Sequence, residues 1–316
     1  MALALFLVIL SLVVLVVGAD ITVDAGRRLA KQLGVSPLLV GLTLTSVGTS
    51  LPEVATNMAA GWSGSQGADA SGMALGNVLG SNLALMTLFL GIAGLPDGLR
   101  VPGRLVSRDG LIGLAALLLV GLLGLDGAVG RGDGLILLGC YAAYLGGLVL
   151  HERRELGEDD ADEGDQDTRV RDPLRLVGGL AMVLVGAHVM VQQGLVLADL
   201  LGVPDVVVGV AVGVATGFPE LAVTIRAGQR DEPMLALGNL LGSCVANPLL
   251  ALGSGALVFP VMVAWRTIAF DGAFTFAASA IALVLMWDRR DLHRGEAIAL
   301  LMLFVLYAWL RITLGP

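Results

Sequence analysis

Long apolar segments, separated by short polar ones, divide the whole chain. Ten of them are close to the roughly 20 residues that a helix needs to cross a bilayer. They cover residues 3–20, 36–60, 71–94, 109–126, 132–150, 174–195, 204–227, 233–259, 265–287 and 296–314. Each segment is continuously apolar and does not alternate with polar residues, which favours helices over the strands of a β-barrel. The sequence therefore predicts an all-α polytopic membrane protein with ten transmembrane helices.

The composition fits a chain that lies in lipid. Hydrophobic residues make up 56% of it and charged residues 15%, whereas soluble domains average about 25% charged residues. The net charge of -8, without a basic patch interleaved with aromatic residues, argues against nucleic-acid binding. We expect a multi-pass protein of the cell membrane. The sequence predicts that the lipid bilayer surrounds the protein. It implies no resident cofactor and no protein partner.

The basic residues are distributed unevenly among the predicted loops. If the loops are numbered in chain order, every second loop lies on the same side of the membrane. Of the 19 lysines and arginines, 16 lie in one of these two sets of loops, and the exceptions are Arg131, Arg266 and Arg311. Cytoplasmic loops carry such an excess of positive charge. We therefore expect both termini to lie outside and the acidic 151–173 loop to lie in the cytoplasm.

Short motifs recur in the same order in the two halves of the chain. VGTSLPE at 47–53 returns as VATGFPE at 214–220, and ALGNVLGSN at 74–82 returns as ALGNLLGSC at 236–244. Each half holds five predicted spans, and an odd number makes the second copy enter the membrane from the opposite side. Inverted repeats of this kind are typical of transporters. The predicted parts are a first inverted repeat over 1–150 with its motif region at 41–91, an acidic linker at 151–173, and a second inverted repeat over 174–316 with its motif region at 208–253.

Glu53 and Glu220 hold the same place in the two copies, each in an apolar segment and each directly after a proline. A carboxylate at that depth costs several kcal/mol, about 2.5–3.5 on insertion scales, which marks the pair as functional. Proline removes a backbone donor and clashes with the carbonyl four residues back, so we expect each helix to break just before its glutamate. Carbonyls freed near Thr49 and Thr216 would then face a cavity or an ion.

The two GN-x-x-GS motifs supply neutral oxygens. Asn77 and Ser81 lie four residues apart on one helix face, as do Asn239 and Ser243, and Asn247 follows one turn later. Two carboxylates with amide, hydroxyl and carbonyl oxygens make a hard-oxygen site, which suits calcium better than magnesium. No histidine or cysteine joins this set, which argues against zinc and copper.

These motif regions resemble the two alpha-repeats of the cation/calcium antiporter superfamily, to which the sodium/calcium exchangers belong. Glu53 within GTSLPE and Ser81 within GNVLGSN look like the first repeat. Glu220 within ATGFPE and Ser243 within GNLLGSC look like the second. The resemblance implies that the two glutamates coordinate calcium and that the two serines line sodium sites.

The resemblance also implies roles for the neighbouring positions. Oxygens of the residues before the glutamates complete the calcium and sodium sites, here Thr49, Ser50 and Thr216. A polar residue four positions after each motif serine lines the central site. Asn247 fits this pattern in the second repeat, whereas Leu85 departs from it in the first. Two further departures are Gly217, where the family usually has serine, and Cys244, where it has asparagine.

The expected function is secondary active antiport, with calcium exchanged for sodium by alternating access, and not an enzymatic activity. The oxygens missing at Leu85 and Gly217 leave open an exchange of calcium, or another divalent cation, for protons, because burial favours the protonated carboxyl group. A serine hydrolase would need a histidine base near Ser81 or Ser243, and no span offers one there. A non-transporting protein on the same scaffold also stays open at this point.

Overall fold

The computed structural model describes the chain except for residues 68–70, 97–98, 102, 157–165, 203–213, 290 and 315–316. Within the described residues, eight helices are long and apolar enough to cross a membrane. A ninth candidate is the bent pair of segments Pro37–Thr49 and Leu51–Ser65. Of the ten predicted spans, only the one at 204–227 has no counterpart among these, and its first half lies outside the described residues.

Two compact units make up the chain, and each takes residues from both halves of the sequence. Unit 1 comprises Met1–Thr49 and Leu145–Leu240, and unit 2 comprises Ser50–Tyr144 and Leu241–Pro316. Glu220 therefore belongs to unit 1 and Glu53 to unit 2. Two helices cross from one unit into the other, namely α9 (Arg131–Leu156) and α13 (Pro233–Ala246).

Unit 1 is built around a pair of long helices. Its elements are α1 (Ala2–Leu33), α2 (Pro37–Val40), the π-helical turn η1 (Gly41–Thr45), α3 (Ser46–Thr49), α10 (Gln166–Leu200), α12 (Phe218–Gln229) and the first half of α13. Its buried apolar core draws on α1, α10, α12 and α13, with Ala19, Val183 and Val223 among its members. The core packs these four helices into one body.

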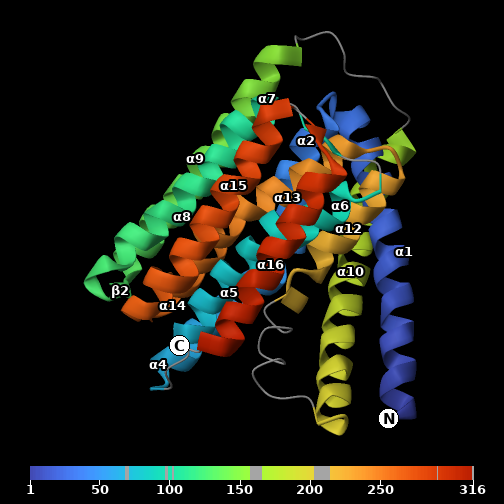
Figure 1. Ribbon diagram of the computed structural model, residues 1–316. Coiled ribbons are helices and arrows are strands. Elements are labelled where there is room, and N and C mark those ends of the chain that lie inside the picture. The colour runs from blue at the N-terminus through green and yellow to red at the C-terminus, as the bar shows by residue number, and fades with distance from the viewer. Residues whose placement is uncertain are drawn as a thin grey trace. The chain divides into compact units, whose positions relative to one another are not determined.

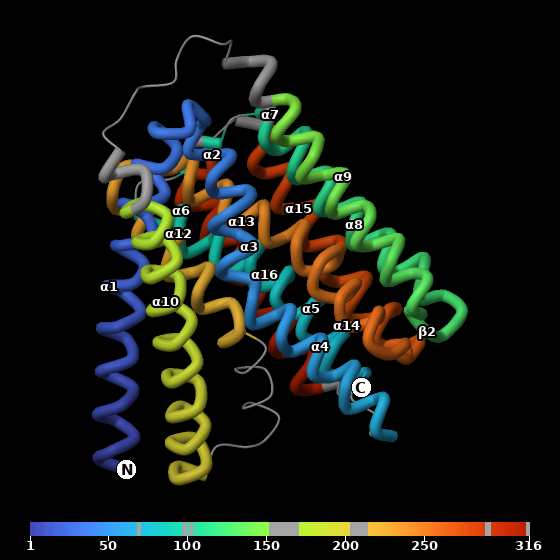
Figure 2. Tube along the Cα trace, turned by 180° about the vertical axis from the view of Figure 1, so that it is seen from behind, coloured from blue at the N-terminus to red at the C-terminus, as the bar shows by residue number. Residues whose placement is uncertain are grey.

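The helices α1 and α10 run side by side along most of their length (Figures 1 and 2). Glycines allow this close approach. A Cβ atom added to Gly179 would lie 2.8 Å from the backbone nitrogen of Thr22, and one added to Gly186 would lie 2.9 Å from the backbone oxygen of Ser11. The two helices therefore pack backbone against backbone at these glycines.

Two helix ends in unit 1 follow from local sequence. The first span, predicted over 3–20, continues as helix to Leu33 and ends at Gly34, which adopts the left-handed conformation with φ 63° that glycine favours after a helix. Ser36 then caps α2 by accepting a hydrogen bond from the backbone N–H of Leu39 at 3.2 Å. The polar residues after position 20 end the apolar segment but not the helix.

Unit 2 holds the remaining elements. Its helices are α4 (Leu51–Ser65), α5 (Ser71–Leu83), α6 (Leu90–Gly94), α7 (Gly103–Leu105), α8 (Leu111–Leu123), α14 (Leu252–Val258), α15 (Ala273–Arg289) and α16 (Arg294–Leu314). Between them lie the π-helical turns η2 (Ala84–Phe89), η3 (Val106–Gly110), η5 (Asn247–Ala251) and η6 (Thr267–Gly272), and the 3-10 turn η4 (Gly124–Asp126). The strands are β1 (Leu99–Arg100), β2 (Ala128–Val129), β3 (Val261–Met262) and β4 (Asp291–Leu292). In Figure 1, α8 and α15 lie side by side.

Four two-residue strands join loops from opposite halves of the sequence. β1 pairs with β4, with Leu99 opposite Leu292, and β2 pairs with β3, with Val129 opposite Val261. Both pairs are antiparallel. The loop between predicted spans 3 and 4 thus meets the loop between spans 9 and 10. The loop between spans 4 and 5 meets the loop between spans 8 and 9.

A buried aspartate opens the fourth span of each half. Tyr144 donates its hydroxyl to Asp109 at 3.0 Å, and Tyr307 donates its hydroxyl to Asp271 at 2.9 Å. Each tyrosine belongs to the fifth span of the same half, and each aspartate lies in a π-helical turn. The duplication therefore extends to tertiary contacts in unit 2.

Helix also extends into the predicted linker from both sides. α9 continues to Leu156 and α10 begins at Gln166. The residues between them lie outside the described part of the chain.

Candidate functional site

The first motif glutamate lies in the first turn of a helix that starts after a break. α4 begins at Leu51, following Ser50 with φ -80° and ψ 5°. Pro52 is near the start of that helix, where its missing N–H leaves no hydrogen bond unmade. The chain bends by 42° between the segment that ends at Thr49 and α4. The predicted break is confirmed, and Glu53 is completely buried.

The second motif glutamate has the same local structure. Residues 216–217 form a turn, and α12 begins at Phe218 with Pro219 in its first turn. Glu220 is buried, while Thr216 in the turn before it is half-buried. The predicted break is therefore confirmed in this copy too.

The asparagines and serines predicted from the GN-x-x-GS motifs are all buried, namely Asn77, Ser81, Asn239, Ser243 and Asn247. The first asparagine of each motif donates to the same group in both copies. The side-chain nitrogen of Asn77 lies 3.4 Å from the carbonyl oxygen of Glu53. That of Asn239 lies 3.1 Å from the carbonyl oxygen of Glu220. Each copy thus ties its GN helix to the helix that carries its glutamate.

In unit 1, the amide group of Asn239 has partners at both ends. Its nitrogen also donates to the hydroxyl of Thr224 at 3.2 Å, and its oxygen lies 3.1 Å from the hydroxyl of Thr49. Thr49 and Glu220, both predicted site residues, are thereby joined through Asn239. Within unit 1, hydrogen bonds of Asn239 thus connect Thr49, Thr224 and the carbonyl of Glu220 in one network.

In unit 2, two contacts join the remaining predicted residues. The hydroxyls of Ser50 and Ser243 lie 3.2 Å apart, and the side-chain nitrogen of Asn247 donates to the hydroxyl of Ser81 at 3.0 Å. Ser50 precedes α4, while the other three side chains come from α5, α13 and η5. Within unit 2, these contacts bring Ser50 to Ser243 and Asn247 to Ser81.

Unit 2 also buries amide oxygens that lack a hydrogen-bond partner among the described residues. They belong to Asn57, Asn77, Asn82 and Asn247. An unsatisfied buried acceptor typically costs about 1–3 kcal/mol. Such groups are uncommon in native proteins, and four in one unit point to a ligand that amide oxygens can bind, such as a cation.

Sequence reasoning missed two residues of this site, Asn57 and Thr224. Each follows its glutamate by four residues, and each is buried. The nitrogen of Asn57 donates to the carbonyl oxygen of Glu53 at 2.9 Å. The two residues are 167 positions apart, as Glu53 and Glu220 are, so a search of the repeat for polar pairs at that separation would have found them.

The departures noted in the sequence have clear structural places. Leu85 is buried in η2, as Asn247 is buried in η5, so an apolar side chain fills the position of an amide. Gly217 precedes α12 as Ser50 precedes α4. Each departure removes one side-chain oxygen from the set that the resemblance implies.

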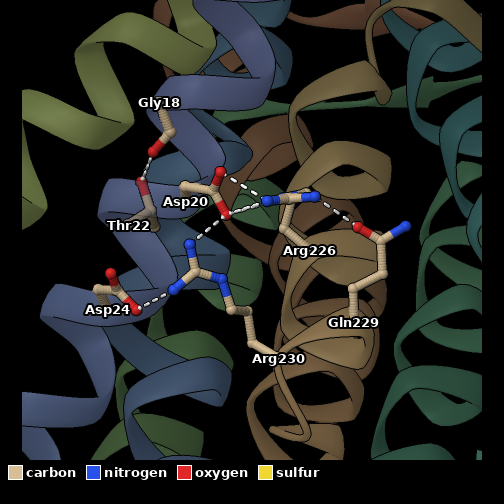
Figure 3. Close-up of polar contacts among 7 residues, drawn as sticks. All are labelled: Gly18, Asp20, Thr22, Asp24, Arg226, Gln229 and Arg230. Atoms are coloured by element: carbon tan, nitrogen blue, oxygen red, sulfur yellow. Dashed lines mark hydrogen bonds and ion pairs between the residues drawn. The ribbon is translucent and has the colours of Figure 1, made fainter.

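An ion-pair cluster within unit 1 joins α1 to the helix that carries Glu220 (Figure 3). Arg226 on α12 donates to both carboxylate oxygens of Asp20 on α1, at 2.5 and 2.6 Å. Arg230 lies 3.0 Å from Asp20 and 2.9 Å from Asp24. Asp20 thus holds two arginines at once, and the cluster fixes α1 against α12.

Replacing Asp20 with asparagine is expected to lower the free energy of unfolding by about 1–2 kcal/mol, because two arginines lose one charged partner at a partly exposed site. Thermal unfolding of the detergent-purified protein measures the effect. Asp24→Asn is the matched control, since Arg230 is the one ion-pair partner of Asp24 within the described part of the chain, and Asp24 is more exposed. Equal effects of the two substitutions would contradict a central role for Asp20 in the cluster.

Comparison with protein families identifies one that covers nearly the whole chain. Residues 3–150 and 173–313 match the family model described as sodium/calcium exchanger protein. The sodium/calcium exchanger MaX1 of Methanosarcina acetivorans is 30% identical over 341 residues, covering 95% of this chain and 96% of that protein. The inner membrane protein YrbG of Escherichia coli is 30% identical over 319 residues, covering 98% and 96%.

Solved structures of a sodium-calcium exchanger share the fold of this chain. A structure of the sodium-calcium exchanger NCX_Mj, soaked with 10 mM Na⁺ and no Ca²⁺, superposes with a TM-score of 0.83 at 28% identity. The match covers 96% of this chain and 97% of that one. A second structure of NCX_Mj, soaked with 2.5 mM Na⁺ and 0.1 mM Ca²⁺, has a TM-score of 0.81 and covers 99% of both chains.

Proposed function

The chain belongs to the sodium/calcium exchanger family, whose members are transporters and not enzymes, and we propose that it exchanges calcium for sodium across a cell membrane by alternating access. The observation that carries the proposal is the pair of buried glutamates, each directly after a break in an apolar helix. Each is hydrogen-bonded through its carbonyl to a buried asparagine.

The proposed calcium ligands are the carboxylates of Glu53 and Glu220. Two carboxylates neutralise a divalent cation, and calcium accepts further neutral oxygens at flexible geometry. The proposed neutral ligands for calcium and sodium come from the other predicted residues: Thr49, Ser50, Asn77, Ser81, Thr216, Asn239, Ser243 and Asn247. All of them except the half-buried Thr216 are buried, which supports the proposal, because hydroxyl and amide oxygens compete for a cation best where water is excluded.

Coupling between the two fluxes follows from charge. A site with two carboxylates and no cation would carry two negative charges through a low-dielectric barrier, at a cost of several kcal/mol for each charge. Bound calcium removes that cost, and so do sodium ions. The transporter therefore changes its access only when loaded, which is the condition for exchange instead of leak.

We propose the inverted-repeat topology with ten spans as the framework of this cycle. The strand pairing supports it: β1 with β4, and β2 with β3, join loops of the same parity. Loops of the same parity lie on the same side of the membrane when the second copy is inverted. The excess of basic residues in one set of loops supports an orientation with both termini outside and 151–173 in the cytoplasm.

The moving parts in this proposal are α1 and α10. Their glycine contacts make them one piece, and exposed apolar side chains cover the first half of α1, as at Leu5, Phe6 and Ile9. Apolar side chains exposed in this way suit a lipid-facing surface that slides without exposing polar groups to lipid.

Transport into proteoliposomes tests the function. Vesicles loaded with sodium and diluted into sodium-free medium with radioactive calcium are expected to accumulate calcium. This calcium uptake should stop when an ionophore collapses the sodium gradient. A pH gradient imposed without sodium is the comparison. Uptake that follows the pH gradient and ignores sodium would favour exchange for protons through the same glutamates. Uptake that needs neither gradient would contradict antiport.

A further inference from the structure

We propose that Asn57 is a sodium ligand of this protein, acting with Asn77 beside Glu53 and supplying the oxygen that Leu85 cannot. The inference rests on the proposed function, because it assigns a ligand within the same transport site. It concerns a residue outside the paired motifs, in unit 2.

The two amide groups adjoin. The side-chain nitrogens of Asn57 and Asn77 lie 2.9 and 3.4 Å from one atom, the carbonyl oxygen of Glu53. With both nitrogens committed to that carbonyl, both amide oxygens point elsewhere. Asn57 also follows Glu53 by one helical turn, so the two side chains share one face of α4.

Both amide oxygens are buried and have no hydrogen-bond partner among the described residues. Asn57 is 0% exposed and Asn77 7%. Buried amide oxygens in native proteins nearly always accept a hydrogen bond or bind a cation. A pair of such oxygens on adjoining amides provides two neutral ligands for a hard cation.

In the second copy, the corresponding amide group has partners for both its nitrogen and its oxygen. There Thr224 stands in place of Asn57, and its hydroxyl accepts from Asn239. The oxygen of Asn239 in turn lies 3.1 Å from the hydroxyl of Thr49. The amide oxygen of Asn239 therefore has a hydroxyl within hydrogen-bond distance, whereas the part of the chain that the structure describes offers no such partner to the amide oxygens of Asn57 and Asn77.

Charge balance favours sodium over calcium as the occupant. One carboxylate with two neutral amide oxygens balances a single positive charge, whereas calcium is bound most tightly where more carboxylates converge. In the first copy, Leu85 fills the position that Asn247 occupies in the second, so an apolar side chain replaces an amide there. Asn57 would give the first copy a side-chain oxygen in place of that one.

A matched pair of substitutions separates ion binding from packing. Asn57→Thr introduces the residue of the other copy, whose hydroxyl can donate to the same carbonyl oxygen four residues back and still offers an oxygen to a cation. Asn57→Val introduces a side chain of nearly the same shape as threonine that offers no oxygen. Thr87→Val is the control, since the Thr87 hydroxyl is buried and, among the residues that the structure describes, donates to the carbonyl of Leu83 four residues back and to no other group.

The measurement is the thermal stabilisation of the purified full-length protein by sodium chloride or calcium chloride, with total ionic strength held constant by choline chloride. For Asn57→Val we expect the sodium concentration at half-maximal stabilisation to rise about tenfold, and the calcium value to change much less. Asn57→Thr should keep the sodium value close to that of the wild type, and Thr87→Val should change neither value.

An unchanged sodium value in folded Asn57→Val would overturn the inference. So would an equal loss of response to both ions in Asn57→Val and Asn57→Thr, which would indicate a packing role. If Asn57→Val does not fold, Asn57→Asp decides: an added carboxylate should lower the calcium concentration needed, and no change in either ion would refute the assignment. A wild-type protein that responds to neither ion would instead refute the proposed function.

Discussion

Replacing Glu53 or Glu220 with glutamine is expected to reduce sodium-driven calcium uptake by about 100-fold or more. Glutamine keeps the size of the side chain and one oxygen but removes the negative charge, so a divalent cation is no longer neutralised by two carboxylates. The free energy of unfolding of these two variants should not decrease, although their transport does. Both glutamates are buried, and removing a buried charge relieves its desolvation cost.

Glu232→Gln is the matched control for this experiment. Glu232 is also mostly buried, at 15% exposure of its side chain, but it pairs with Arg27 at 2.9 Å and lies outside the motifs. Uptake should persist in that variant. Wild-type uptake by either motif variant, measured in vesicles with equal protein content, would contradict the assignment of both carboxylates to the transported calcium.

Gly238→Ala is expected to destabilise the protein by about 2–3 kcal/mol, because the added methyl group overpacks a contact between backbones. Its Cβ atom would lie 2.7 Å from the carbonyl oxygen of Leu38 and 3.0 Å from the Cα of Gly41. Backbone atoms cannot rotate away as a side chain can. Thermal unfolding in detergent and the fraction of monodisperse protein measure the loss.

The repeat itself provides the control for this prediction. Gly76 is the glycine at the same motif position in the first copy, and a Cβ atom there meets nothing within 4 Å. Gly76→Ala should be neutral or stabilising, since alanine is favoured over glycine in a helix by up to about 1 kcal/mol. Equal losses in the two alanine variants would show that helix geometry, and not the contact with Gly41, sets the requirement for glycine.

Hydropathy predicted where the chain is apolar more reliably than where its helices end. The first helix continues past Asp20 to Leu33 because charged residues do not break a helix, whereas the left-handed Gly34 does. The two compact units were beyond prediction from the repeat alone. Sequence similarity pairs 47–53 with 214–220, yet packing separates the two glutamates into different units.

For the candidate site, the glutamates and the asparagines of both GN motifs could be predicted from the sequence because chemistry and duplication coincide there, and the structure buries them. Asn57 was not, since a single asparagine in a helix has many ordinary explanations. The partners of Arg226 and Arg230 were also unpredictable. Both arginines counted simply as loop charges in the orientation argument, whereas the structure pairs them with aspartates of α1.

The cluster around Asp20 has a consequence for how sodium dependence is measured. Its charged side chains are 24–41% exposed, so mobile ions reach them, and at 0.1 M salt the Debye length is only about 10 Å. Any dissolved salt, including one that the protein does not transport, weakens the hold of α1 on α12. A titration with sodium chloride alone therefore sums two responses, occupancy of the transport site and screening of this cluster.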